Sequence, residues 1–571
     1  MKKQVVTWSL IITLVITLAA CGSSNNANTG STDNAGESNA ASAESDTAAQ
    51  NNTDDSSVGD TALGKTYSVL VQPTGKIVDI TTNDFTLWLE EETGVHLDFT
   101  VLSSDAQETV SMMLNSGENL PDILMVPLSY VQQYLYGQQG VLLNLSPLIE
   151  QNAPRIAQAH RDYPLYTATS TRPDGNIYYI SAYEECYHCT GSQKMWINQR
   201  WLDNLGLNMP STTDEFKQTL IAFRDQDANG NGDPNDEVPM SGMATGWHPT
   251  MYSYLMNAFI YYAGNQNPMY VQNGTVAASF STPEWREGMA YINDLFREGL
   301  IDENAFVQDQ AALQALTTGE HVLTGAIPEG HTAMFVTIDS PNIFDFAAVP
   351  PLKGPNGVQY SAYFPNVAKS GDGIAISSSC SDPEGALAWV DFLFGEEATI
   401  RSQYGVMGRD WEYNDDPTIL GLHDGQALFH TFGNAPVYAS TQLTAAWEHT
   451  GPFLWVSYIF AGQAVLGGEG YDLEKVLYDA TKNYEPYFPD EFAMNLSFDG
   501  DDAEFMAMNR QLMADFISQS SAEFIIGTRD ITNDNDWDAY LTELEGYGLS
   551  QYVEVMQRGY DAQQAIIASL R

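Results

Sequence analysis

The sequence predicts an α/β fold of two lobes, and two observations carry this prediction. Between residues 67 and 126, short apolar strands alternate with amphipathic helices, a rhythm typical of a parallel sheet covered by helices on both faces. The chain after residue 62 is about 500 residues long, whereas a single hydrophobic core rarely grows beyond about 250–300 residues. A chain of this length and pattern is therefore expected to build two cores.

Residues 1–20 have the features of a signal peptide. Lys2 and Lys3 precede an apolar run over 5–18 that is too short to span a membrane. The run ends in L-A-A-C-G (18–22), which resembles a bacterial lipobox and implies cleavage before Cys21 with lipidation of that cysteine. Several acyl chains would anchor the protein stably to the outer face of the cell membrane. The alternative is an ordinary secretory cleavage that leaves Cys21 free.

Residues 21–62 are expected to form a lipid-anchored, disordered linker. After Cys21 the segment consists of Ser, Asn, Ala, Gly, Thr, Asp, Glu and Gln, with Val58 as the only large apolar side chain. A segment of this composition cannot bury enough apolar surface to fold.

The first elements of the folded part follow in order. The sequence predicts a strand at 67–71, a helix capped by Asn83 or Asp84 and ended by Gly94, a strand at 95–102, a helix at 106–115 and a strand at 122–126. In such sheets, ligands bind beyond the carboxyl ends of the strands. Pro73 and Tyr130, which follow the first and third strands, are therefore candidate ligand contacts.

Further elements are expected downstream, among them a strand at 178–180 and a strand at 195–197. Predicted helices cover 199–205, a segment capped by Thr212 or Thr213, 283–296, 308–316 and 381–394.

The turn after the helix capped at Thr212 or Thr213 has the pattern of a calcium loop. Oxygen-bearing side chains recur at every second position with glycines between them, and Ca²⁺ takes six to eight oxygens at about 2.3–2.6 Å. An EF-hand frame can also be placed from Asp225, but Asp236 then stands where Glu is usual. The remaining alternative is a turn that binds nothing. The candidate ligands of a structural Ca²⁺ are Asp227, Asn229, Asn231, Asp233, Asp236 and Glu237.

Cys186 and Cys189 form a Cys-x-x-Cys pair with three possible states. A local disulfide is favoured because disulfides form in exported proteins. Free thiols are the second possibility. A zinc or redox role is the third, but a zinc site needs more ligands and only Cys380 remains in the folded part.

Aromatic side chains are frequent after residue 180 and could line a binding site. A typical pocket combines apolar, aromatic walls with a few directing polar groups. For any one of these residues, a place in the core is the alternative. Trp247 and Trp447 are favoured because polar, turn-rich sequence surrounds them. The other candidates are Tyr183, Tyr252, Trp411 and Trp455.

Several segments together resemble a known family. These are W-I-N-x-x-W-L-D-x-L-G-L-x-x-P-x-T-x-D-E-F (196–216), D-x-N-G-N-G (227–232), D-E-x-P (236–239), P-D-I (121–123) and the segment 524–549. They are similar to the family 1 extracellular solute-binding proteins, in particular the large lipoproteins that serve carbohydrate ABC importers of Gram-positive bacteria. The resemblance covers nearly the whole chain after residue 63.

The resemblance implies a two-lobed, periplasmic-binding-protein-like fold of type II, with discontinuous lobes, a hinge and an interlobe cleft. The expected boundaries are 63–180 plus about 318–380 for lobe one, and about 181–317 plus 381–571 for lobe two. Ligand would touch both lobes only when they close, and this difference in contact would drive closure. The resemblance also implies an ABC permease as partner, and a monomer is expected.

The net charge limits which classes of ligand are expected. The formal net charge is −51, which excludes nucleic acid as a partner because that needs a basic surface. It also opposes polyanionic ligands, so a neutral oligosaccharide is favoured over a uronate. A glycan-binding sensor or adhesin is an alternative function. A glycan-degrading enzyme is another, but no G-x-S-x-G, H-E-x-x-H or phosphate-loop motif is present, so no enzyme is expected.

Overall fold

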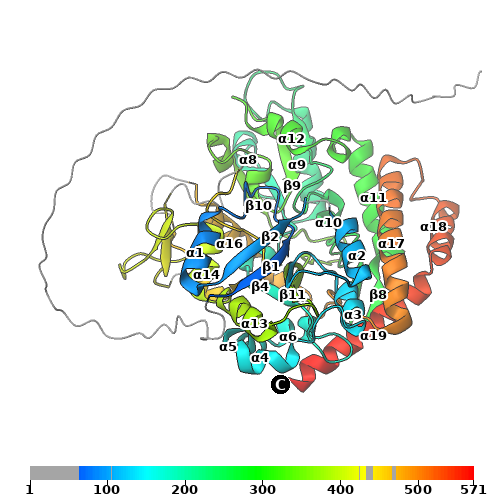
Figure 1. The fold of residues 1–571 in the computed structure, drawn as a ribbon. Coiled ribbons are helices and arrows are strands. Elements are labelled where there is room, and N and C mark those ends of the chain that lie inside the picture. The colour runs from blue at the N-terminus through cyan, green and yellow to red at the C-terminus, as the bar shows by residue number, and fades with distance from the viewer. Residues whose placement is uncertain (1–63, 104–105, 424, 433–441, 466–470, 571) are drawn as a thin grey trace, which may run out of the picture. The chain divides into compact units, whose positions relative to one another are not determined.

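The computed structural model describes residues 64–103, 106–423, 425–432, 442–465 and 471–570 (Figure 1). The predicted signal peptide, Cys21 and the linker lie outside the described residues. In the described part of the chain, no helix combines the length and apolar composition that a membrane crossing requires.

The first sheet has six strands in the order β14-β4-β11-β3-β1-β2. Its strands are β1 (Thr66–Val71), β2 (His96–Val101), β3 (Ile123–Met125), β4 (Ile180–Glu184), β11 (Ala368–Ile376) and β14 (Leu454–Trp455). β1 pairs in parallel with β2 and β3, as the alternation of strand and helix predicts. β11 is antiparallel to both β3 and β4, so a late part of the chain enters the middle of this sheet.

The helices associated with this sheet begin and end at the expected signals. The Asn83 side chain accepts from the Phe85 N–H at the start of α1 (Asp84–Thr93), and Gly94 ends the helix with a left-handed φ of 63°. The other helices are α2 (Gln107–Ser116), α3 (Tyr130–Gln138), α4 (Ser146–Asn152), α5 (Pro154–Asp162), α6 (Pro164–Ser170), α13 (Pro383–Phe392), α14 (Glu396–Tyr404) and α15 (Ser457–Ala461).

The second sheet has four strands in the order β10-β5-β9-β6. Its strands are β5 (Met195–Asn198), β6 (Val238–Met240), β9 (Thr324–Pro328) and β10 (Phe346–Val349). β5 runs antiparallel to β9 and β10, whereas β6 is parallel to β9. Two hairpins stand apart from the main sheets: β7 (Met269–Gln272) with β8 (Thr275–Ala278), and β12 (Trp411–Tyr413) with β13 (Phe429–Thr431).

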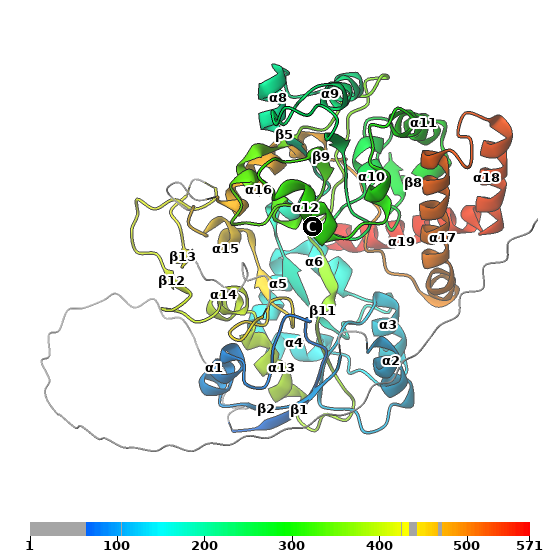
Figure 2. The same ribbon diagram turned by 90° about the horizontal axis from the view of Figure 1, so that it is seen from above.

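The helices of this second part include a C-terminal group, of which α17 (Gly500–Ile526) packs beside α11 (Pro283–Arg297) in both views (Figures 1 and 2). That group also contains α18 (Asp534–Gly546) and α19 (Leu549–Ser569). The remaining helices are α7 (Tyr187–Thr190), α8 (Gln199–Leu205), α9 (Thr213–Asp225), α10 (Met251–Met256), α12 (Gln310–Thr317) and α16 (Leu473–Tyr484).

Two large cores correspond to the two sheets. The first gathers β1 side chains such as Val69 with Trp389 of α13, and the second gathers Ile197 of β5 with Trp285 of α11 and Tyr540 of α18. The expectation of two cores from chain length is therefore met.

Sheet membership differs from the predicted lobe boundaries. The strands β9 and β10 lie within 318–380, the range expected in lobe one, yet both pair in the second sheet. Helix α13 lies in the range expected in lobe two but packs on α4 and α5 in the first core. We therefore propose that the first lobe comprises the described residues of 64–184 and about 366–465, and that the second comprises about 187–364 and 471–570.

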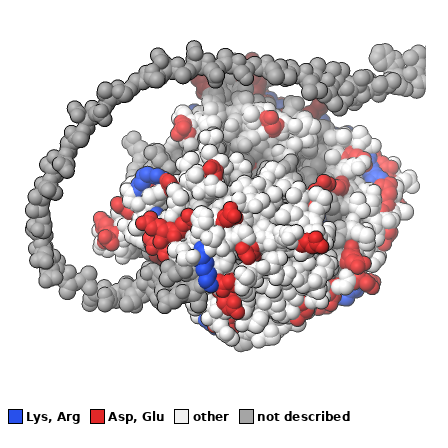
Figure 3. Space-filling view, viewed as in Figure 1, with Lys and Arg blue, Asp and Glu red and all other residues white. Residues whose placement is uncertain are grey.

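The surface shown in Figure 3 carries more acidic than basic side chains, scattered rather than gathered in one region. This agrees with the formal net charge of −51.

Candidate functional site

A cavity of ≈ 1340 Å³ is lined by residues from both sheets and their loops. Glu184 and Lys369 reach it from β4 and β11 of the first sheet, and Trp455 reaches it from β14. Trp247 and His331 reach it from loops of the second part of the fold. Its volume exceeds the usual range of about 300–1,000 Å³ for small-ligand pockets, so it can hold a ligand of several rings.

One wall of the cavity is a strip of rings centred on Trp247, which we call the aromatic strip. Ring centroids of His188, His248 and His331 lie 6.0, 5.5 and 5.7 Å from that of Trp247. The strip continues through Phe364, whose ring lies 4.4 Å from that of His248. Burial lowers the pKa of His248 and of His331 to about 4, so both rings are neutral at pH 7.

His248 holds an unusual backbone conformation to join this strip. Its φ is +64°, a left-handed value that only a few per cent of non-glycine residues adopt, with Asn, Asp and His the most frequent among them. The Ser192 hydroxyl lies 2.8 Å from its Nε2, and the Gln193 amide donates to its carbonyl at 3.1 Å. These contacts from the segment before β5 keep the ring at the cavity despite the strain.

A second group of rings lines the cavity from the first part of the fold. The ring of Trp455 lies 5.9 Å from Tyr404 and 5.2 Å from Phe460. The indole nitrogen of Trp455 is buried and has no acceptor among the described residues. The ring of Trp455, rather than its enclosed N–H, is therefore what the side chain can offer to a ligand.

The charged side chains of the cavity are mostly acidic. Glu184, Asp309, Asp339 and Glu474 line it, whereas Lys369 is the only Lys or Arg among the lining residues that the structure describes. Lys369 forms an ion pair with Glu184. The cavity therefore has no spare Lys or Arg for an anionic ligand.

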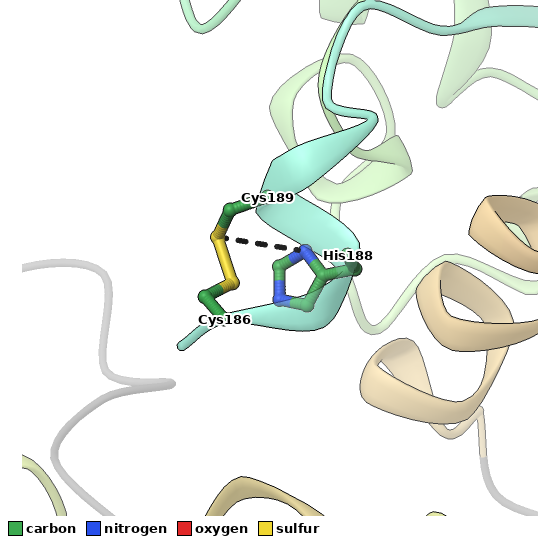
Figure 4. A group of neighbouring side chains, drawn as sticks. All are labelled: Cys186, His188 and Cys189. Atoms are coloured by element: carbon green, nitrogen blue, oxygen red, sulfur yellow. Dashed lines mark hydrogen bonds between the residues drawn. A yellow bond between two sulfur atoms is a disulfide. The ribbon is translucent and has the colours of Figure 1, made fainter. Parts of the chain in front are cut away.

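The Cys-x-x-Cys turn forms part of the cavity wall. A disulfide joins Cys186 and Cys189 across α7, with Nδ1 of His188 4.0 Å from the Cys189 sulfur (Figure 4). The three side chains are close enough to hold a metal, but the disulfide removes both thiolates that would bind it. The buried Lys194 ammonium fixes the turn by donating to the carbonyls of His188 and Gly191 at 3.1 and 2.7 Å.

Two predicted ligand contacts lie in the first core instead. Trp447 is fully buried, donates from its indole to the Thr86 hydroxyl at 2.8 Å and packs edge-on against Phe85. Trp411 is also fully buried and donates to the Gly405 carbonyl at 3.0 Å. With both indoles enclosed and bonded, neither is available to a ligand.

The remaining candidates also lie outside the cavity lining. Tyr183 is buried against Tyr163 and Tyr166, and Tyr130 donates its hydroxyl proton to the Ala368 carbonyl at 2.6 Å. Tyr252 packs against the second core, and Pro73 is absent from the described lining. Of the eight predicted contacts, the structure thus brings only Trp247 and Trp455 to the cavity.

Sequence reasoning passed over His248, His331 and Phe364. A signal existed for His331, because it lies in the loop that follows the buried strand β9, where ligands of α/β sheets commonly bind. His248 stands beside Trp247 in the W-H-P sequence. Phe364 has no such signal, since it lies in a loop before β11.

The predicted calcium loop connects α9 to β6. Asp227 Oδ2 accepts from the Gly232 N–H at 3.0 Å, and both carboxylate oxygens of Asp236 accept from the amides of Asn229 and Asn231. Two carboxylate oxygens, Oδ1 of Asp227 and Oε2 of Glu237, are buried with no donor among the described residues. Buried acceptors of this kind, gathered in one loop, fit a hard cation.

The fold defines an α/β protein of two lobes, with a cavity lined by loops of both sheets. The chain belongs to the bacterial extracellular solute-binding proteins. The sequence model of this family matches residues 61–400 of the chain. Its fold is the two-lobed, type II fold of periplasmic binding proteins, as its structural neighbours confirm.

Among known relatives, the chain is similar to the fructooligosaccharide ABC transporter substrate-binding protein FusA of Streptococcus pneumoniae, with 29% identity over 84% of this chain and 86% of the relative. It is also similar to lipoprotein LipO of Bacillus subtilis, with 27% identity over 63% of this chain and 72% of the relative. The structure of FusA with kestose matches with a TM-score of 0.72 and 27% identity, over 88% of this chain and 99% of that one. An EF-hand mutant of FusA in complex with fructo-nystose matches equally well, with a TM-score of 0.72.

Proposed function

We propose that this protein captures a neutral oligosaccharide outside the cell and delivers it to an ABC permease. The observation that carries the proposal is the cavity itself, which combines rings on its walls with no unpaired Lys or Arg among its described lining residues. Sugar rings present flat C–H faces that aromatic rings cover, and their hydroxyls then pair with polar side chains of the lining such as Gln314 and Asn366.

The relatives support a carbohydrate ligand and suggest which sugars to test first. FusA is a fructooligosaccharide-binding protein that has been solved with kestose, and it is 29% identical to this chain over the aligned residues. We therefore propose short fructooligosaccharides as the first candidates. A uronic oligosaccharide fits less well, because Glu184, Asp309, Asp339 and Glu474 would repel its carboxylates.

The test is calorimetric titration of residues 63–571 with kestose, nystose and a neutral glucan series, with a trigalacturonate as the charged comparison. We expect one neutral series to bind and to remain chemically unchanged. Binding of trigalacturonate alone would contradict the neutral assignment. Release of smaller sugars during the titration would instead favour the glycan-degrading alternative. Unchanged uptake of the bound sugar by cells that lack this protein would favour the sensor or adhesin alternative.

We infer that Asp227, Asn229, Asn231, Asp233, Asp236 and Glu237 hold a structural Ca²⁺. The partnerless oxygens of Asp227 and Glu237 support this inference, as does the EF-hand of the related FusA. Bound calcium would neutralise the carboxylates of the loop, and the loop residues themselves tie the end of α9 to the start of β6.

We further propose that Cys21 carries the lipid anchor and holds the protein at the outer face of the membrane. The L-A-A-C-G sequence and the similarity to lipoprotein LipO support this proposal. Metabolic labelling with a radioactive fatty acid should label the wild type and leave a Cys21→Ala variant unlabelled.

A further inference from the structure

Glu329 is a fully buried carboxyl group behind the aromatic strip. It follows directly after β9, and its N–H donates to the Lys194 carbonyl at 3.1 Å. Its Oε1 accepts from the Trp247 N–H at 2.9 Å, whereas its Oε2 is buried with no donor among the described residues. No described cation forms an ion pair with it. An ionised carboxylate in such a place is costly, so the neutral acid is the stable form.

Glu329 and its neighbour Gly330 together fix the backbone of Trp247. The Gly330 N–H donates to the Trp247 carbonyl at 2.7 Å, so both polar groups of the Trp247 backbone are bonded to consecutive residues. The indole packs directly on Gly330, where an added Cβ would lie only 2.0 Å from the ring. On the other side of Trp247, an added Cβ on Gly246 would lie 2.5 Å from Glu329 Oε1. Little space is left for movement.

We propose that Glu329 is a positioning residue for sugar binding: as a buried neutral acid it holds Trp247 in place, so that the aromatic strip is formed before the ligand arrives. This inference rests on the proposed function of the cavity. A preformed site avoids the cost of ordering side chains on binding, so the affinity depends on an intact contact between Glu329 and Trp247.

Protonation of Glu329 should therefore control affinity. Burial raises the pKa of Glu329 to about 8, so it is neutral at pH 7 and loses its proton in mildly alkaline solution. The resulting charge has no nearby cation to pair with, and it is relieved only by water entry or by movement of residues 329–330. Either change displaces Trp247 from the cavity wall.

The effect of Glu329 can be separated from the titration of the groups around the Glu329–Trp247 contact. Burial lowers the pKa of His248 and of His331 to about 4, so these rings stay neutral from pH 6 to pH 9. In the same wall, Nε2 of His188 lies 3.2 Å from Oε2 of Glu474. Burial lowers the pKa of Lys194 to about 7, so Lys194 titrates in the same range as Glu329. A comparison of variants that all retain Lys194 removes its contribution.

The experiment measures the Kd of kestose for the mature protein between pH 6 and pH 9, in the wild type and in Glu329→Gln. Gln keeps an acceptor oxygen for the Trp247 N–H but cannot ionise. We expect the wild-type affinity to fall about tenfold by pH 9, because only about a tenth of the protein then keeps the competent, protonated form. Glu329→Gln should bind about as well as the wild type at pH 7 and keep that affinity at pH 9.

Two further variants complete the design. Glu329→Leu removes the acceptor and should weaken binding at every pH. Asp391→Asn alters another buried carboxyl, which accepts from the Ile156 N–H at 2.8 Å in the first core, and should leave the wild-type pH profile in place. An alkaline loss of affinity that is equal in the wild type and in Glu329→Gln would overturn the proposal.

Failure of the proposed function would look different, because no form of the protein would then bind kestose, nystose or a neutral glucan at any pH. In that case, the contact between Glu329 and Trp247 is tested without ligand, by measuring hydrogen exchange in a peptide that contains Trp247. Exchange should be faster in Glu329→Leu than in Glu329→Gln at pH 7. Equal exchange in the two variants would refute the role of Glu329 by itself.

Discussion

At the scale of single residues, ligand capture should depend most on Trp247. Its ring stands at the centre of the aromatic strip. Its backbone N–H and carbonyl are bonded to Glu329 and Gly330. We predict that Trp247→Ala weakens the binding of kestose about tenfold or more, which corresponds to ~1.4 kcal/mol. An aromatic contact contributes about 0.5–1.5 kcal/mol beyond its buried area, and the variant also opens the wall to water. Titration calorimetry measures this change.

Trp447→Phe is the matched control for this prediction. Trp447 is a tryptophan of the first core, and its replacement should lower the free energy of unfolding while leaving the Kd near the wild-type value. A loss of affinity in Trp447→Phe equal to that in Trp247→Ala would show that the assay reports general damage to the fold.

Which of these two tryptophans lies at the cavity could not be predicted from the sequence. Both stand in polar, turn-rich sequence, and local sequence gives no reason to separate them. They differ in their distant neighbours. Trp447 is enclosed by Phe85 and Thr86 from the start of the chain, whereas Trp247 packs on Gly330 at the end of a strand. Burial of this kind is fixed by chain topology, which short-range patterns do not contain.

At the scale of elements, the calcium loop can be tested by experiment. Two assignments of its first ligand are possible, Asp227 or, in the EF-hand frame, Asp225. We predict that removal of calcium with EGTA lowers the midpoint of thermal unfolding by a few degrees. An ion at a hundred times its Kd contributes about 2.7 kcal/mol to the folded state, and that contribution is lost on chelation. Differential scanning calorimetry with and without calcium measures the shift.

Variants of Asp225 and Asp227 distinguish the two assignments of the first calcium ligand. Asp227 has a buried, partnerless oxygen, whereas Asp225 is occupied by an ion pair with Arg224 at 2.7 Å. We therefore expect Asp227→Asn to abolish the response to calcium and Asp225→Asn to retain it. The reverse result would move the first ligand to Asp225, and a response in both variants would place the ion elsewhere.

Element boundaries were predictable where local chemistry sets them. The Asn83 cap, the left-handed Gly94 and the Thr212 cap that accepts from the Glu215 N–H all agree with the sequence signals. The position of an element in a sheet was not predictable in this way. Strand β11 lies between β3 and β4 of the first sheet, although more than 180 residues along the chain separate it from either, and no local pattern encodes that pairing.

At the scale of the whole molecule, the chain passes between the two sheets several times. It leaves the first sheet after β4, builds the second sheet with β5, β6, β9 and β10, and returns to the first with β11. Each proposed lobe is therefore discontinuous, and the crossing segments next to β4 and β11 lie at the cavity, where Glu184 and Lys369 pair. Segments of this kind are where a hinge between lobes can absorb a change in backbone angles.

This arrangement leads to a prediction about motion. A sugar that contacts Trp247 on one wall and Trp455 on the other makes both contacts only when the walls are close, and this difference in contact favours the closed form. We predict that saturating kestose lowers the radius of gyration of residues 63–571 in small-angle X-ray scattering. Trp247→Ala at the same sugar concentration should contract less, because fewer molecules are occupied. An unchanged radius in a wild-type sample that calorimetry shows to be saturated would mean that the cavity is preformed and that capture proceeds without closure.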